Sequence, residues 1–504
     1  MSLVLLHDLL DRRAHLSPDT PAITSGGHTW SYAQLRDRTV ACAQWLRRQG
    51  VARGDRVLTL AAGHPQVAVV SYAVSRIGAI HSIISDQTRP FHLEHILGDC
   101  APRLVLAAED AATTAASLAA DGSMGVAVRE LDEVPAVPAD DEAALTAGVS
   151  VDPVALIYTS GSTSMPKAVV SNHRQMLFAA RAIQRRLGYR GHDSVFCCLP
   201  LSFDYGLYQL YLSTLAGARL VLGGGNDAGP ALLNRLRDEN ITVLPAVPTL
   251  AATLARLLGR TGTTVQSLRL VTNTGAALGV ATSDRLRKHV AGLGVVPMFG
   301  LTECKRVSIE EPNADLVRPG SVGRPLPDTE AFVVDRDGRR LPAGETGELV
   351  VRGPHVMCGY WRAQELTARR FRRDEVGQPL LHTGDLCRLD GEGNIYFVGR
   401  EDDVYKQNGF RVSSIEVEAA AMDVPGVHLA AVLPPADGRG ARLFVTGPVT
   451  RDALVAELGE RLEQAKLPGE FHVVDAIPLT VAGKVDKRAL SGVRDTVPVG
   501  GGAP

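Results

Sequence analysis

The stretch that decides the fold reads Tyr158-Thr159-Ser160-Gly161-Ser162-Thr163-Ser164-Met165-Pro166-Lys167. An apolar, β-branched run, Val154–Thr159, leads straight into a turn that is rich in hydroxyl groups and ends in a lysine. Exposed backbone N–H groups, hydroxyls and one ammonium in a tight turn are what a polyphosphate needs. A Walker A loop places Lys-Ser/Thr directly after glycine, whereas Pro166 occupies that place here. Because such a run is as often a plain surface loop, its meaning depends on the rest of the chain.

Strand-like and helix-like patterns alternate on both sides of this loop. The expected strands are Arg56–Leu60, Leu104–Ala107, Val154–Thr159, Val195–Leu199, Arg219–Leu222, Val243–Ala246 and Leu268–Thr272. The expected helices include Tyr32–Gln49, Gln66–Ile77 and Leu250–Leu258. Such alternation predicts an α/β fold in which helices cover parallel sheets.

The pattern changes from Gly320 onward. Short runs between Gly/Asp/Pro turns predict a small antiparallel β unit with strands at Glu330–Asp335, Gly347–Arg352 and Asn394–Val398. Strands and helices then resume at Ser414–Ala421, Leu429–Leu433, Leu443–Thr446 and Arg451–Glu463. We therefore predict a large N-terminal domain (1–399), a hinge (400–403), a small α+β C-terminal domain (404–495) and a disordered tail (496–504).

The composition is that of an ordinary globular protein, with 504 residues, 45% hydrophobic and 21% charged. The formal net charge of −2 gives no field that would attract nucleic acid or an anionic membrane. No run approaches the ~18 uninterrupted apolar residues of a membrane span, and the N-terminus lacks a signal-peptide pattern. The 7 cysteines are scattered without CxxC spacing, which favours free thiols and a cytoplasmic location.

Further motifs follow the loop along the chain. They are Phe299-Gly300-Leu301-Thr302-Glu303, Thr383-Gly384-Asp385, Gly399-Arg400-Glu401-Asp402, Asn408-Gly409-Phe410-Arg411 and Gly483-Lys484. With these motifs the chain resembles, over nearly its whole length, the adenylate-forming superfamily of acyl-CoA synthetases, non-ribosomal peptide adenylation domains and luciferases. Ser164 and Ala168 depart from the family, which usually has glycine at both positions. The resemblance implies a large domain of parallel αβα sheets with a small β subdomain, followed by a small mobile α+β domain.

The resemblance also implies a reaction, in which a carboxylate attacks the α-phosphate of ATP, forms an acyl-AMP and releases pyrophosphate. Lys167, Thr302, Glu303 and Lys484 would be the catalytic residues, with Glu303 as the Mg²⁺ ligand. The implied nucleotide-binding residues are Thr159, Ser160, Gly161, Ser162, Thr163, Lys167, Gly275, Ala276, Ala277, Phe299, Gly300, Thr302, Asp385, Arg400 and Arg411. ATP and Mg²⁺ are thus the expected cofactors.

The C-terminal domain would carry the mobile part of this site. By the same resemblance, Lys484 bridges the substrate carboxylate and the α-phosphate, Asp402 is the hinge, and Gly409 borders the path of a pantetheine thiol. Because a lysine so late in the chain has to be delivered to the site, we expect the small domain to rotate about the hinge.

The acid-binding pocket is expected around Phe203 and Asp204, because amino-acid-adenylating members of the family carry Phe-Asp at this place. There the aspartate would pair with the substrate ammonium, since a buried carboxylate needs a cation. Alternatively, Asp204 caps a helix that begins at Tyr205. The expected pocket residues are Phe203, Asp204, Tyr205, Tyr208, Thr249, Thr272, Thr274, Met298, Arg306, Val307 and Lys484. Arg306 is expected either to bind an acidic side chain of the substrate or to lie outside the pocket in an ion pair.

The chain ends soon after Lys484, so we expect a freestanding enzyme that passes the acyl group to the phosphopantetheine of a separate carrier protein. A basic cluster for carrier docking, or merely a solvated face, comprises Arg362, Arg369, Arg370, Arg372 and Arg373. The alternative function is an aryl- or short-chain acyl-CoA ligase. A more remote alternative is a non-catalytic nucleotide- or acyl-binding homologue. No nucleic-acid or membrane partner is expected.

Overall fold

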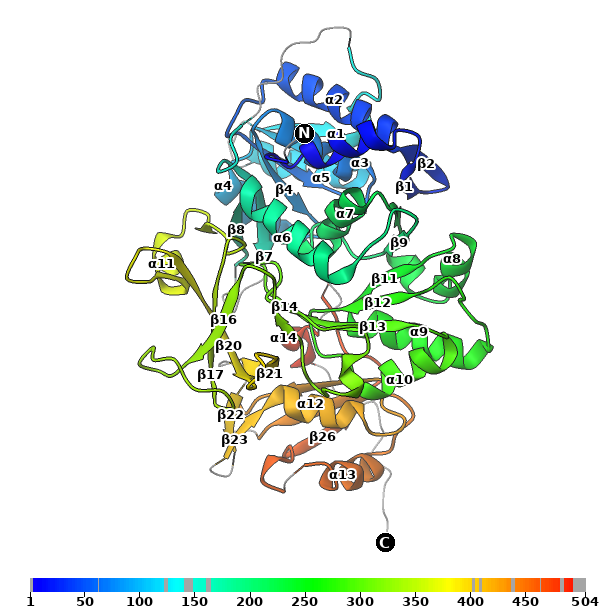
Figure 1. The fold of residues 1–504 in the computed structure, drawn as a ribbon, viewed down its shortest axis with the longest axis vertical. Coiled ribbons are helices and arrows are strands. Elements are labelled where there is room, and N and C mark those ends of the chain that lie inside the picture. Colours follow the sequence, from blue (N-terminus) through cyan, green and yellow to red (C-terminus); the bar gives the residue numbers. More distant parts are fainter. Residues whose placement is uncertain are drawn as a thin grey trace.

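The computed structural model describes residues 3–61, 63–121, 126–139, 148–159, 165–400, 404–407, 410–436, 440–462, 464–480 and 485–492. Two large, mostly parallel sheets and their helices form the N-terminal part (Figure 1). An antiparallel sheet flanks them, and a small α+β unit lies at the C-terminal end of the molecule. The predicted fold class is confirmed.

The first large sheet contains β3 (Arg56–Leu60), β4 (Ile80–Ile84), β5 (Leu104–Ala107), β6 (Ala127–Glu130), β7 (Pro153–Thr159), β8 (Lys167–Asn172) and β18 (Gly359–Tyr360). Its order is β18-β8-β7-β4-β3-β5-β6. The strands from β7 to β6 are parallel, whereas β8 runs antiparallel to both β7 and β18. The predicted phosphate loop therefore connects two adjacent strands of this sheet.

The second large sheet contains β1 (Pro21–Ser25), β2 (His28–Ser31), β9 (Ser194–Cys197), β10 (Arg219–Leu222), β11 (Val243–Ala246), β12 (Leu270–Asn273), β13 (Gly294–Phe299), β14 (Ser308–Ile309) and β15 (Arg324–Pro325). Its order is β15-β14-β13-β12-β11-β9-β10-β1-β2. β12 and β13 are parallel neighbours, so their carboxyl ends share one edge of the sheet. In sheets of this kind ligands bind beyond the carboxyl ends of the strands.

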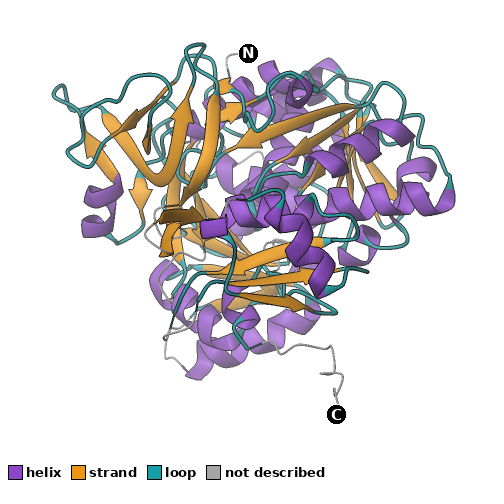
Figure 2. Cartoon of the chain, turned by 90° about the horizontal axis from the view of Figure 1, so that it is seen from below, coloured by secondary structure: helices purple, strands orange, loops and turns teal. Residues whose placement is uncertain are grey.

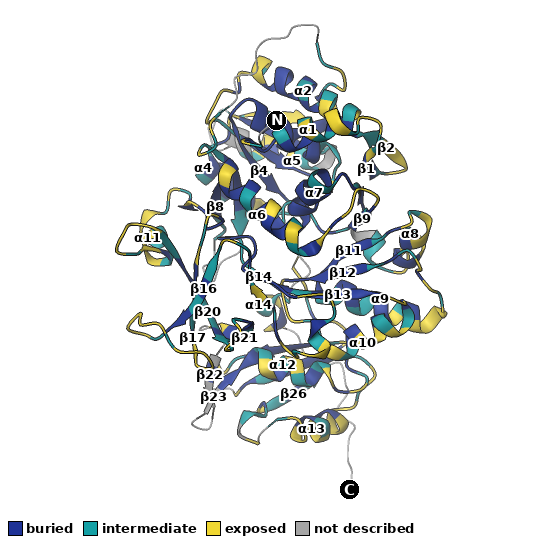
Figure 3. Cartoon of the chain, in the orientation of Figure 1, coloured by how far each residue is buried: buried dark blue, intermediate teal, exposed yellow. Residues whose placement is uncertain are grey.

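Ten α-helices accompany the two sheets within the described residues. They are α1 (Asp8–Leu16), α2 (Tyr32–Arg48), α3 (Gln66–Arg76), α4 (Pro90–Cys100), α5 (Glu109–Asp121), α6 (His173–Leu187), α7 (Asp204–Ala216), α8 (Leu232–Asp238), α9 (Pro248–Thr261) and α10 (Val280–His289). Ser31 and Asn172 start α2 and α6 with capping boxes that satisfy free backbone N–H groups. One apolar cluster joins α3, α6 and α7 to strands of both sheets. α3 and α7 are buried along nearly their whole length, whereas α6 also has an exposed face (Figure 3). Removal of this apolar surface from water is the main force that holds the sheets together.

The antiparallel sheet forms the predicted β subdomain. It contains β16 (Glu330–Val334), β17 (Thr346–Arg352), β19 (Phe371–Arg373), β20 (Pro379–Leu389) and β21 (Ile395–Arg400), and α11 (Gln364–Arg370) precedes β19. Its core contains Leu349 and Leu381 together with Val169 of β8. The subdomain thus packs directly against the strand that begins at Lys167.

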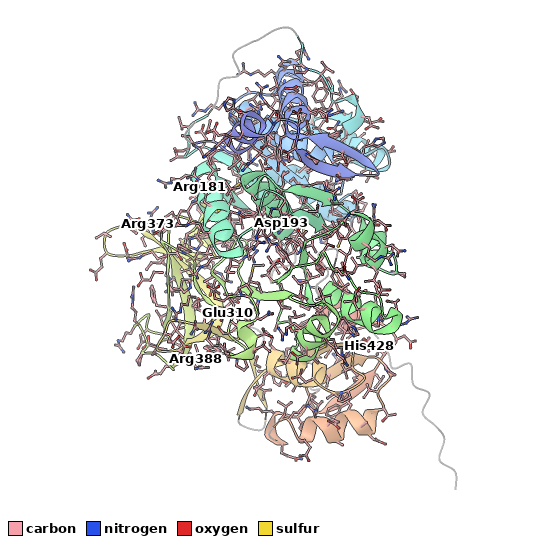
Figure 4. All side chains as sticks on the ribbon, turned by 45° about the vertical axis from the view of Figure 1, so that its right-hand side comes forward. Arg181, Asp193, Glu310, Arg373, Arg388 and His428 are labelled. Atoms are coloured by element: carbon pink, nitrogen blue, oxygen red, sulfur yellow. The ribbon has the colours of Figure 1, made fainter. Side chains whose placement is uncertain are left out.

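The C-terminal unit contains β22 (Val404–Gln407), β23 (Phe410–Ser413), α12 (Ser414–Met422), β24 (Leu429–Leu433), β25 (Arg442–Thr446), α13 (Arg451–Gly459), β26 (Glu470–Val473) and α14 (Lys487–Leu490). Helices lie on the sheet that β24, β25 and β26 form (Figure 2). The Oγ atom of Ser413 donates a hydrogen bond of 2.7 Å to the carbonyl of Val398 in the large domain. His428 lies at the same boundary (Figure 4), and its pKa is lowered by burial and by Arg256 and Arg285 of the large domain.

The predicted elements differ from the observed ones mainly at their ends. β9 ends at Cys197 instead of Leu199, because its ladder with β10 ends at the pair of Leu222 and Cys197. β12 begins at Leu270 instead of Leu268, whose N–H is engaged in a turn to Val265. α13 ends at Gly459 instead of Glu463, since glycine weakens a helix.

The domain borders stay a prediction. β21 ends at Arg400, the first residue of the predicted hinge, and 401–403 lie outside the described residues. The predicted tail, 496–504, also lies outside them. None of the helices in the described part of the chain has the length and apolar character that a membrane span requires.

Candidate active site

A lysine, a tyrosine and a glutamate from three separate segments form the centre of the site. The ammonium of Lys167 donates to the hydroxyl of Tyr360 at 3.3 Å and lies 4.3 Å from the centroid of its ring. The same hydroxyl donates to Oε1 of Glu303 at 2.5 Å. The predicted phosphate-loop lysine and the predicted metal ligand are thus brought together, with Tyr360 between them.

Backbone pairing fixes this arrangement. β18 pairs with β8, so that Tyr360 lies opposite Val169, and the N–H of Trp361 bonds to the carbonyl of Ala168. On the other side, the N–H of Met357 donates to the carbonyl of Glu303 at 2.9 Å. The segment that carries Tyr360 is therefore hydrogen-bonded both to the strand of Lys167 and to the loop of Glu303.

Two further cations surround the lysine. Burial lowers the pKa of Lys167, the carboxylate of Glu303 raises it, and Arg370 and Arg400 lower it again. Arg370 donates to the carbonyl of His382 at 3.1 Å and is half-buried. It belongs to this site more than to a solvated basic face. Three cations around one carboxylate make a place where a polyanion gains from direct charge pairing.

Asp385 lies at the edge of this cationic group. β20 and β21 pair so that Asp385 faces Arg400, and the guanidinium lies 3.5 Å from its carboxylate. Asp385 is buried, and the Oγ1 atom of Thr383 accepts a hydrogen bond from its backbone N–H. Gly384 has φ +68°, and a Cβ there would meet the guanidinium of Arg370 at 2.4 Å. The left-handed backbone conformation therefore favours glycine beside Asp385, and a side chain there would also have to displace Arg370.

The predicted adenine strip follows β12. Gly275, Ala276 and Ala277 are exposed, and Gly275 has φ +94°, which an L side chain rarely adopts. Phe299, at the end of β13, packs against Phe397 with ring centroids 5.2 Å apart. A Cβ on Gly300 would lie 2.5 Å from the carbonyl of Lys305. An exposed backbone strip and an aromatic ring thus lie beyond the carboxyl ends of neighbouring strands.

The predicted acid pocket contains a buried arginine. Arg306 is 5% exposed, and its guanidinium donates to Oγ1 of Thr274 at 2.8 Å and lies 5.3 Å from the ring of Tyr205. No described carboxylate forms an ion pair with it, and its Nε has no described hydrogen-bond partner. Of the two expectations for Arg306, the external ion pair is wrong for the described residues, because the side chain points inward to Thr274.

Asp204 does not cap a helix. It is the first residue of α7, whose N-cap is Phe203, and no side chain caps this helix. Asp204 is 8% exposed. Burial lowers the pKa of the Lys305 ammonium to about 8, although the carboxylate of Asp204 raises it. The pocket therefore has buried groups of both signs, with Lys305 near Asp204 and also bonded to the carbonyl of Thr302 at 3.0 Å.

The other predicted pocket residues are divided between two apolar clusters. The hydroxyl of Tyr205 bonds to Oγ1 of Thr272 at 2.6 Å, whereas the buried hydroxyl of Tyr208 has no described partner. Tyr205, Tyr208 and Met298 belong to the main core cluster, and Val307 belongs to the core of the β subdomain. Thr249 is half-buried near the start of α9.

Several predicted site residues cannot be placed. Those that lie outside the described residues are Ser160, Gly161, Ser162, Thr163, Asp402, Gly409 and Lys484. The backbone of Arg411 lies in β23, and its side chain is outside the description. The sequence prediction missed Tyr360, Lys305 and the inward position of Arg370. Only the closeness of Lys305 to Glu303 and Arg306 in the sequence could have drawn attention to one of them.

The residues present fit a magnesium-bound polyphosphate. Oε1 of Glu303 accepts from Tyr360, and no described residue donates to its second oxygen, which leaves a ligand for a hard cation. Another group of possible metal ligands, His7, Asp8 and Asp11, has structural partners instead. Asp11 pairs with Arg76, and Asp8 accepts from the N–H groups of Val4 and Leu5.

Comparisons with known proteins cover both parts of the chain. The family described as AMP-binding enzyme matches residues 10–361, and its C-terminal domain family matches 416–484. A feruloyl-CoA synthase of Amycolatopsis sp is 30% identical, over 94% of this chain and 96% of its own. The structure of VinN with L-aspartate is 39% identical, covers 78% of this chain and 98% of its own, and has a TM-score of 0.71. ATP-bound MatB of Rhodopseudomonas palustris is 27% identical, covers 96% and 98%, and has a TM-score of 0.85.

Proposed function

Because this chain belongs to the AMP-binding enzyme family, whose members are adenylate-forming acid–thiol ligases, we propose that it activates an amino acid that carries a second carboxylate. The product would be the aminoacyl-AMP, formed from ATP with release of pyrophosphate. The observation that carries this proposal is the guanidinium of Arg306, buried beside Thr274 without a described carboxylate partner.

The nucleotide side of the pocket supports the first half of the reaction. Lys167, Arg370 and Arg400 would pair with the phosphates, and Asp385 would accept hydrogen bonds from the ribose. Glu303 would hold Mg²⁺, which supplies charge neutralisation at the phosphates when bound. Held in this way, the α-phosphate would be open to a carboxylate that could not otherwise approach a second anion.

The acid side supports the choice of substrate. Burying an unpaired guanidinium is costly, and an anionic group of the substrate would remove that cost. Asp204 would in turn accept the substrate ammonium, and the nearby hydroxyl of Tyr208 has no partner among the described residues. A pocket with buried charges of both signs fits a molecule that has an ammonium and a carboxylate in addition to the reacting one. L-aspartate, which VinN holds in its complex, has these groups.

The second half of the reaction would transfer the aminoacyl group to the phosphopantetheine thiol of a carrier protein. The predicted roles of Lys484 in adenylation and of Gly409 beside the thiol support this step through the family resemblance. Coenzyme A is the competing acceptor, and the competing substrate is an aryl acid, which the 30% identity to a feruloyl-CoA synthase favours. Two buried tyrosines, Tyr205 and Tyr208, would suit an aromatic ring as well.

Pyrophosphate exchange with a panel of acids tests the proposal. We expect exchange with acidic amino acids and little with neutral amino acids, succinate or ferulate. Loading of a holo-carrier protein is then compared with thioester formation on coenzyme A. Exchange with only those acids that lack an amino group would contradict the proposal and favour the aryl-CoA ligase.

A further inference from the structure

Tyr360 lies between two residues of opposite charge that the reaction needs separately. The strand pairing of β18 with β8 and the bond from Met357 to Glu303 bring Lys167 and Glu303 to the same place. Lys167 and Glu303 nevertheless form no ion pair with each other. None of the ion pairs within 4.0 Å among the described residues joins them. Each contacts the phenol of Tyr360 instead.

The direction of the two hydrogen bonds is fixed by chemistry. An ammonium has only donors and a carboxylate has only acceptors, so the phenol oxygen must accept from Lys167 and donate to Glu303. The ring also faces the ammonium, which adds a cation–π contact.

We propose that Tyr360 is a positioning residue that keeps Lys167 and Glu303 from pairing with each other, so that both stay available to the magnesium nucleotide. Without the hydroxyl, the ammonium and the carboxylate would move together, because opposite charges in a half-buried site attract strongly. Lys167 would then have to leave Glu303 before it could bind a phosphate. The proposal rests only on the nucleotide half of the proposed function and does not depend on which acid is activated.

Neighbouring residues hold the side chain of Tyr360 in one position. Tyr360 is 5% exposed, its N–H donates to Oγ1 of Thr367 at 2.9 Å, and its ring packs edge-on against Phe371. A Cβ on the preceding Gly359 would lie 2.4 Å from the methyl group of Thr367. The tyrosine is therefore held in one position by its neighbours, and its hydroxyl is the atom that faces both charges.

The test is a double-mutant cycle on ATP binding, with no acid present, read by titration calorimetry in EDTA. Tyr360→Phe keeps the ring and removes the hydroxyl, and we expect the Kd for ATP to rise about fivefold to tenfold, the scale of one net hydrogen bond. Glu303→Gln removes the competing carboxylate. In that background, Tyr360→Phe should change the Kd by less than about twofold, because no ion pair remains to form.

Tyr396→Phe is the matched control, since Tyr396 donates to Asp390 at 3.2 Å in the same subdomain and outside the site. We expect it to leave the Kd for ATP unchanged. An equal loss from Tyr360→Phe in both Glu303 backgrounds, or no loss in either, would overturn the proposal. So would a Tyr360→Phe protein that fails to fold, because that result would assign the hydroxyl to stability instead of to spacing.

Discussion

The proposed nucleotide side and the proposed acid side of the site differ in how their polar groups are satisfied. Around Tyr360, the charged groups partner one another: Lys167 and Glu303 share the phenol, and Arg400 lies beside Asp385. Around Tyr205, by contrast, Arg306 has one hydrogen bond, and neither its Nε nor the hydroxyl of Tyr208 has a described partner. On the first side each of these charged groups has a described partner, whereas on the second side polar groups remain that a ligand would complete.

This difference indicates how each side meets its ligand. Groups that already partner one another must exchange partners when the nucleotide binds, so single substitutions there should mainly change nucleotide affinity. Buried groups without partners instead select the molecule that supplies the missing ones, because leaving them unpaired costs free energy. Substitutions on that side should therefore change which acid is accepted.

Lys484→Ala should have the largest effect, because this lysine would contact both ligands. We expect adenylate formation to fall at least ~100-fold, the scale of losing one charge-stabilising group, while ATP still binds. Rapid-quench measurement of adenylate and calorimetric titration of ATP separate the two effects. Activity equal to that of the wild type would remove the lysine from the reaction.

Arg306→Gln should have the next largest effect, and only on the acid side. The substitution removes charge-assisted hydrogen bonds to the second carboxylate, so kcat/KM for an acidic amino acid should fall about 30-fold. The KM for ATP should not change. Arg388→Gln is a matched control, because Arg388 stacks on Tyr396 outside the pocket. If Arg306→Gln instead raises the KM for ATP, Arg306 acts on the nucleotide and not on the acid.

Asp385→Asn should have a smaller effect, restricted to the nucleotide. It weakens the hydrogen bonds to the ribose and the attraction to Arg400, so the KM for ATP should rise about tenfold. Exchange rates measured against both substrates check this result, since the KM for the acid should stay the same. A change in acid selectivity would mean that the two sides are coupled.

Lys305→Met should have the smallest effect, which appears as a change in how the free energy of unfolding depends on pH. Burial lowers its pKa to about 8, so above that pH the folded protein binds fewer protons at this residue than the unfolded one. The destabilising cost of charging Lys305 is therefore present below pH 8 and is relieved as the pH rises. Relative to Lys305→Met, the wild type should gain about 1 kcal/mol of unfolding free energy between pH 7 and 8.5 in urea titrations. If the free energies of unfolding of the two proteins changed with pH in parallel, the lowered pKa of Lys305 would be refuted.

The sequence predicted the architecture well, because hydrophobic patterning and motif order are local signals. The strand Val154–Thr159 and the alternation of strands and helices around it come from such patterns, whereas β8 and β20, which carry Lys167 and Asp385, were not among the expected strands. Tyr360 was missed because its role arises only from pairing with Lys167, 193 residues earlier in the chain. For Arg306, the sequence left two interpretations open. The contact of its side chain with Thr274 depends on the pairing of β12 with β13, which the sequence alone does not show.

The central claim is that Arg306 selects a second carboxylate. Its most direct test is the ratio of kcat/KM in pyrophosphate exchange between an acidic amino acid and its two monoamides, measured for the wild type and for Arg306→Gln. One monoamide loses the reacting carboxylate and the other loses the anchoring one. We predict that kcat/KM of the wild type is at least ~30-fold lower for both monoamides than for the acidic amino acid. Arg306→Gln should no longer discriminate against the monoamide that lacks the second carboxylate. Equal selectivity in the two proteins would contradict the claim.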